Sequence, residues 1–186
     1  MPITQAQQNL DLQKLFILAT GSAANSSQIS ELNGMISQNG GMESINSLVD
    51  TYINQLISQQ GSIVTYQAIA KNAFGVILSD AQAQTIITQF AEDGIDSGSK
   101  LLNFLSNMQN VHGDTLDNRS EAASNFLETL SAAGKSGDFT GLGVTDAVRT
   151  LLQNIGPMQS SLDNGVSGLS ALSANLSATD ISGVVD

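Results

Sequence analysis

The only histidine of the chain and the carboxylates near it are the first candidates for acid–base or metal chemistry. His112 lies in a glycine-containing loop, and Asp114 and Asp117 are its nearest acidic neighbours in sequence. A histidine that works as a base or a metal ligand needs partners that orient the ring or complete the site. Two loop aspartates are a small set of partners, so we expect His112 to have no catalytic role.

Two acidic segments offer the hard oxygen ligands that calcium prefers. One comprises Glu92, Asp93 and Asp96, and the other comprises Asp114 and Asp117. The second lacks the ligand order and the central glycine of an EF-hand, and neither is a complete cage, so any calcium site would be weak or shared with a partner. The alternative is that the first segment is a solvated loop and that Asp117 caps a helix, because helix N-termini favour acidic side chains. No other cofactor is expected.

The common catalytic sequence motifs are absent. The sequence has no glycine-rich phosphate loop with its lysine, no Gly-x-Ser-x-Gly turn and no His-Glu-x-x-His zinc motif. It also has no cysteine, which excludes disulfides, thiolate metal sites and thiol nucleophiles. We therefore expect a protein that is not an enzyme.

Charge and polarity narrow the classes of partner. The net charge is −11, from 17 acidic and 6 basic residues, and the basic residues are scattered along the chain. Nucleic-acid binding needs clustered basic side chains and is therefore disfavoured, while contact with an anionic surface would need neutral groups or a bridging divalent cation. Charged residues make up only 12% of the chain, so Gln, Asn, Ser and Thr cover the surface, as on many proteins outside the cell.

No segment has the length and composition of a membrane span or of a Sec signal peptide. No window approaches the roughly 18 apolar residues that a spanning helix requires. Residues 1–18 carry Asp11, Lys14 and several glutamines in place of a basic start and an apolar block. The sequence therefore predicts a protein that does not span a membrane and that is either cytosolic or exported by another route.

The elements that must position these residues are helices. Apolar residues recur at helical spacing almost throughout, glycines interrupt the pattern, and no stretch alternates with the period of a strand. The pattern predicts an all-α bundle of about eight helices, in which a linker at 111–116 precedes a helix that Asp117 opens. The predicted core residues are Leu15, Leu32, Leu48, Ile53, Ile69, Phe74, Ile86, Phe90, Leu102, Leu105, Phe126, Leu130 and Leu151.

The chain repeats itself at an offset of 54 residues. Each unit is expected to contain a helix that ends at a glycine, a short loop, a capped helix, a second glycine and a further helix. We therefore predict two tandem helical-hairpin repeats plus C-terminal helices. The matched glycines are Gly21 with Gly75 and Gly40 with Gly94, and the matched capping pairs are Asn25 with Gln28 and Ser79 with Gln82.

The predicted domain organisation follows from this repeat. A helical domain is expected over 1–156, with repeat units at about 4–57 and 58–110 and following helices at 117–156. Residues 157–186 are rich in Ser, Ala and Gly. Two glycines weaken their helical pattern, so they are predicted to form a tail or linker that is partly helical.

One stretch resembles a known family. AKNAFGVILSDAQAQTIITQFAEDG followed by KLLNFLSNM, within 69–108, resembles the helical repeat in the N-terminal regions of type I-secreted bacterial surface-layer proteins and related adhesins. Residues 15–49 read as a second copy, and DNRSEAASNFLETL at 117–130 resembles the helix that follows the repeats. The resemblance implies a secreted, helical module that anchors a surface layer to lipopolysaccharide, with an uncleaved C-terminal secretion signal.

The leading expectation is therefore a non-catalytic anchoring or assembly domain at the bacterial cell surface. It would bind outer-membrane glycan (lipopolysaccharide) or sibling subunits, as a homo-oligomer or lattice, with calcium strengthening the contact. Two alternatives stay open. The chain is a self-assembling subunit of an extracellular filament or matrix, or it is an intracellular helical adaptor.

Overall fold

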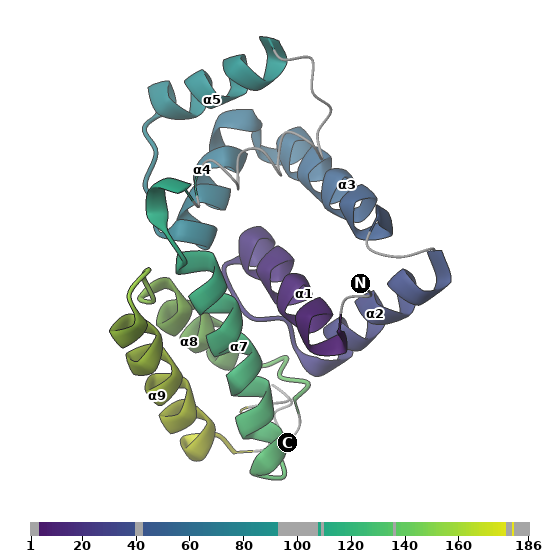
Figure 1. Cartoon of the computed structure of the whole chain (residues 1–186), viewed down its shortest axis with the longest axis vertical. Coiled ribbons are helices and arrows are strands. Elements are labelled where there is room, and N and C mark those ends of the chain that lie inside the picture. Colours follow the sequence, from purple (N-terminus) through teal and green to yellow (C-terminus); the bar gives the residue numbers. More distant parts are fainter. Residues whose placement is uncertain are drawn as a thin grey trace.

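Every element that the structure describes is a helix (Figure 1). The computed structural model describes residues 4–39, 43–92, 108, 110–135, 137–177 and 180, and for residues 39, 43–50, 90 and 142 it describes the backbone alone. Because these residues contain no strand, the all-α prediction is confirmed. The helices are α1 (Gln5–Thr20), α2 (Ser26–Asn39), α3 (Glu43–Gln60), α4 (Ser62–Phe74), α5 (Asp80–Glu92), α7 (Thr115–Ala132), α8 (Leu142–Gln153) and α9 (Gln159–Asn175).

Two central helices hold the others together. α1 contacts both α4 and α7, and α7 in turn contacts α8 and α9. Figure 1 shows α8 and α9 beside α7 at one end of the molecule, with α3, α4 and α5 at the other end. α3 contacts α2 and α4, so the first four helices form a group that α1 and α4 connect to the C-terminal helices.

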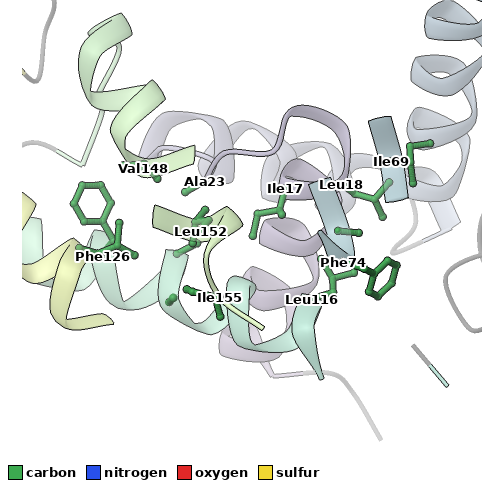
Figure 2. Close-up of a cluster of buried hydrophobic side chains, with 14 of the residues drawn as sticks. Ile17, Leu18, Ala23, Ile69, Phe74, Leu116, Phe126, Val148, Leu152 and Ile155 are labelled. Carbon is green, nitrogen blue, oxygen red and sulfur yellow. The ribbon is translucent and has the colours of Figure 1, made fainter. Parts of the chain in front are cut away.

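One large hydrophobic cluster joins helices from both halves of the chain (Figure 2). Ile17 and Leu18 of α1, Ile69 of α4, Phe126 of α7 and Leu152 of α8 are almost fully buried in it. A smaller cluster lies between α1 and α2. Burial of apolar surface is the main favourable contribution to folding, so these contacts fix how the helices are placed.

The predicted core is largely in place where it is described. Ile53, Ile69, Phe74, Phe126 and Leu130 are buried. Four more residues are partly buried against the two clusters, namely Leu15, Leu32, Ile86 and Leu151. The side chains of Leu48 and Phe90, and all of Leu102 and Leu105, lie outside the described residues.

The repeat recurs in the element bounds. α1 ends at Thr20 and α4 at Phe74, while α2 begins at Ser26 and α5 at Asp80, so both pairs differ by the predicted 54 residues. The first matched glycines also behave alike. Gly21 (φ 75°) and Gly75 (φ 72°) both end a helix in the left-handed conformation that glycine adopts most readily. The second pair, Gly40 and Gly94, lies outside the described residues.

Both predicted capping boxes are formed. The backbone N–H of Asn25 donates to Gln28 Oε1 at 2.8 Å, and the N–H of Gln28 donates to Asn25 Oδ1 at 2.9 Å. The corresponding distances for Ser79 and Gln82 are 2.8 and 3.3 Å. Each box satisfies two backbone donors that a helix start leaves without partners.

The start of α7 differs from the prediction. The helix begins at Thr115 rather than at Asp117, and Val111 and His112 within the predicted linker are helical as well. Thr115 and Leu116 are buried, so core packing extends the helix beyond the point that capping chemistry suggested. Asp117 accordingly lies in the first turn of α7 and is not its cap.

The predicted tail includes a regular helix that contributes to the core. Leu162 and Leu169 of α9 are buried in the large cluster. A Cβ atom on Gly165 would lie 2.3 Å from Ile155 Cδ1, and one on Gly168 would lie 3.0 Å from a methyl group of Leu151. The two glycines that weaken the helical pattern are therefore the residues that let α9 approach the end of α8.

A buried arginine joins the ends of two helices. Arg119 of α7 is 1% exposed, and its guanidinium donates to the carbonyls of Ile155 (3.0 Å) and Gln153 (2.9 Å) at the end of α8. It also donates to the carbonyls of Lys71 (3.3 Å) and Asn72 near the end of α4. Helix C-termini carry partial negative charge and free carbonyls, so one cation stabilises both ends. Burial lowers the pKa of Arg119 to about 10, which leaves it charged at neutral pH.

Candidate functional site

The first four helices enclose an apolar cleft of about 420 Å³. A volume of this size lies within the range of roughly 300–1,000 Å³ that is usual for small-ligand sites. The cleft is lined by Leu15, Phe16, Leu18, Ala19 and Thr20 of α1, Gln28, Glu31, Leu32 and Met35 of α2, Tyr52, Ile53 and Leu56 of α3, and Ile69 of α4.

Helical spacing places these residues on facing surfaces. Gln28, Leu32 and Met35 follow one another at intervals of four and three residues on α2, and Tyr52 and Leu56 are four residues apart on α3. Residues three or four apart lie on the same face of a helix. The same amphipathic pattern that builds the core therefore also builds the walls of the cleft.

The cleft has a buried base and a more open rim. Ile69 and Ile53 are buried at 1% and 4% exposure, whereas Tyr52 is 37% exposed. Leu56 and Met35 are half-buried, and Glu31 is exposed. A ligand in the cleft would therefore contact aliphatic side chains at depth and meet polar groups at the mouth.

The cleft exists because α3 packs mainly against α2 and α4, the helices next to it in sequence. Among the described residues, the main contacts of α3 are with α2 and α4, and the main contacts of α1 are with α2, α4 and α7. Apolar residues of α1 between α2 and α4 are consequently only partly covered. An uncovered apolar concavity of this kind is typical of a binding site.

The charge in the lining of the cleft is of one sign, which is negative. Glu31 is the only charged residue among those that line it. The whole segment 15–70, which includes α2 and α3, contains Glu31, Glu43 and Asp50 but no lysine, arginine or histidine. Glu31 therefore gives the lining of the cleft a negative charge, and no cationic side chain is among the lining residues.

The structure describes three of the five predicted metal ligands, namely Glu92, Asp114 and Asp117. Asp117 forms an ion pair with Lys14 at 2.7 Å, and Asp114 is exposed at the N-cap position of α7. Glu92 is exposed at the end of α5, whereas Asp93 and Asp96 lie outside the described residues. Within the described part of the chain, no three acidic or histidine side chains are grouped as metal ligands would be. The calcium site stays a prediction.

His112 is placed by packing. Its ring is half-buried and lies 6.1 Å, between centroids, from the ring of Phe74 in a tilted arrangement. The contact joins the segment before α7 to the end of α4. This environment gives the histidine a packing contact with an aromatic ring.

Comparisons with family models, with curated proteins and with solved structures find no match. The resemblance to surface-layer proteins therefore remains a hypothesis from sequence. Among the described residues, no helix is long and apolar enough to cross a membrane.

The cleft was not predicted from the sequence, although the sequence contains a signal for it. α1 carries apolar residues at 15–19 without interruption, which is more than one helix face needs. A helix that is apolar around most of its circumference must be covered on several sides. The excess of apolar residues on α1 was the available indication that part of this helix lines a cleft.

Proposed function

We propose that the chain is a non-catalytic binding module whose apolar cleft between α1, α2, α3 and α4 holds the apolar part of a ligand. The observation that carries the proposal is the cleft itself. Its wall residues are mainly aliphatic or aromatic, and its volume of about 420 Å³ suits a small ligand. Filling it would remove apolar surface from water, which is the dominant favourable contribution to binding of this kind.

The lining favours an apolar ligand over a sugar. Carbohydrate sites usually combine several polar groups with flat aromatic platforms, and the only tyrosine in this cleft is Tyr52. Thr20 is already engaged, because its hydroxyl donates to the carbonyl of Phe16 at 2.8 Å. Any glycan contact of the module therefore belongs to the uncharged polar surface outside the cleft.

The setting that we propose is the bacterial cell surface. The resemblance in 69–108 and the low content of charged residues support it. In this setting the module anchors or assembles a larger surface structure, through lipopolysaccharide or through sibling subunits, with calcium as a candidate bridge. Protease treatment of intact cells tests the location, since a surface protein is degraded while cytosolic controls survive.

Dye binding tests the cleft. The neutral dye Nile red should bind to the folded chain with increased fluorescence, and Ala19→Phe, which fills the cleft from α1, should reduce this binding. Leu56→Gln should do the same by making the rim polar. The matched control is Ala171→Phe on the exposed face of α9, which should leave dye binding unchanged. Equal dye binding by all four chains, each shown by circular dichroism to be folded, would overturn the proposed function.

A further inference from the structure

We infer that the ligand of the cleft is a single-chain amphiphile with a positively charged head, such as an alkylamine or an alkyl quaternary ammonium. The inference rests on the proposed function and adds the chemistry of the ligand. Two observations carry it, namely the volume of the cleft and the sign of the charge around it.

The volume sets the size of the apolar part. A methylene group takes up roughly as much space as a water molecule in the liquid, about 30 Å³. The cleft of about 420 Å³ therefore has room for a chain of roughly a dozen methylenes or a compact ring system of that size. A helix of a partner protein, about 10 Å across with its side chains, would fill this volume within roughly one turn of about 5.4 Å, so the cleft cannot hold a complete helix.

The charge sets the head group. Glu31 of α2 lines the cleft and is exposed, and no described residue forms an ion pair or hydrogen bond with its carboxylate. No other charged residue is among those that line the cleft. A carboxylate or phosphate head would be repelled by Glu31, because no basic side chain is among the residues that line the cleft.

Two basic residues beside the cleft, Lys14 and Arg149, are committed to other contacts. Lys14 pairs with Asp117 at 2.7 Å, and Arg149, which pairs with Asp146, donates to the backbone carbonyl of Thr20 at 3.2 Å. Neither lines the cleft. Two aromatic rings add to the preference of the cleft for a cationic head group. Phe16 and Tyr52 line the cleft, and the faces of such rings attract ammonium groups.

The test compares three ligands that share a dodecyl chain. Dodecyltrimethylammonium, neutral dodecyl maltoside and dodecanoate are each used below their micelle concentrations to displace Nile red from the full chain. We expect the cationic ligand to displace the dye at the lowest concentration and dodecanoate at the highest. The variant Glu31→Gln should weaken binding of the cationic ligand by about two- to five-fold and leave binding of the neutral ligand unchanged.

The matched control separates a local effect from the overall charge of −11. Glu128→Gln on the exposed face of α7 removes the same charge away from the cleft, so it should leave all three displacement curves unchanged. Equal displacement by the three ligands, or equal weakening by the two variants, would overturn the inference and leave an apolar binding module standing. A dimer that Ala19→Phe dissociates would also overturn it, because a second copy of the chain would then occupy the cleft. Failure of Nile red to bind at all would remove the proposed function and this inference together.

Discussion

Arg119 shows how much one residue can organise a fold that has few charges. Four backbone carbonyls from two helix ends converge on its guanidinium, and none of its hydrogen-bond partners is a carboxylate among the contacts described. No sequence pattern indicates this role, because an isolated arginine in a helix resembles any surface cation. Only the tertiary arrangement brings the ends of α4 and α8 to the same side chain.

Replacement of Arg119 by methionine should lower the free energy of unfolding by about 2–4 kcal/mol, because the buried carbonyl of Ile155 and the partly buried carbonyls of Gln153 and Asn72 would lose their donor. The variant Arg119→Lys should lose less stability than Arg119→Met. It should still be less stable than the unchanged chain, since one ammonium cannot reach both helix ends. Urea unfolding followed by circular dichroism measures both. Arg149→Met is the control, with an expected loss below about 1 kcal/mol, because this arginine is partly exposed. Similar losses at the two positions would contradict the bridging role of Arg119.

Two helical glycines should respond in opposite directions to alanine. Gly165→Ala should cost about 1–3 kcal/mol, because its Cβ would lie 2.3 Å from Cδ1 and 2.5 Å from Cγ1 of the buried Ile155. Gly34→Ala in α2 should stabilise the chain by about 0.5–1 kcal/mol, since a Cβ there meets no atom within 4 Å and alanine is the better helix former. Thermal or urea unfolding of the two variants gives the sign directly. A stabilised Gly165→Ala would mean that α9 does not pack closely on Ile155.

At the scale of elements, the parts of the fold that depend on local chemistry were predictable. The predictions that Gly21 ends α1 and that Gly75 ends α4 were confirmed, as were the two predicted capping boxes. Each of these features depends on residues within a few positions of one another. The start of α7 and the regularity of α9 were not. In both cases burial against distant residues outweighed the local signals of Asp117 and of the α9 glycines.

The two capping boxes should differ in strength. Asn25 is 6% exposed, and its Nδ2 also donates to the carbonyl of Phe139 at 3.3 Å, so Asn25→Ala should cost about 2 kcal/mol, at the upper end of the range for caps. Ser79 is exposed and caps only its own helix, so Ser79→Ala should cost about 0.5–1 kcal/mol. Chemical unfolding compares the two variants. A smaller loss for Asn25→Ala than for Ser79→Ala would show that the contact with Phe139 adds nothing.

At the scale of the whole molecule, the sequence predicted an all-α fold but not the candidate site. Apolar periodicity identifies which residues avoid water, and it does not distinguish a residue covered by the core from one that lines a cleft. Leu15 and Leu32 were predicted as core residues, and both line the cleft while packing against the smaller cluster. The placement of α3 relative to α1 decides between the two outcomes, and that placement is a property of the assembled helices.

The charge of the whole chain gives a prediction about salt. With 17 acidic and 6 basic residues, repulsion among carboxylates should outweigh attraction, and the ion pairs described are limited to Lys14 with Asp11 and Asp117 and Arg149 with Asp146. Raising sodium chloride from about 0.01 M to about 0.15 M shortens the screening length from about 30 Å to about 8 Å. If this screening raises the free energy of unfolding by about 1 kcal/mol, the melting temperature at neutral pH should rise by about 2–4 °C.

The same measurement near pH 4.1, where the net charge of the chain is close to zero, is the internal control. Repulsion between like charges no longer dominates at that pH, so added salt should give no rise and should weaken the attractive pairs that remain. A rise of equal size at both pH values would mean that salt acts through the apolar surface, whose burial some salts strengthen, and not through charge. A fall at neutral pH would mean that the few ion pairs, such as Lys14 with Asp117, contribute more to stability than the excess of carboxylates removes.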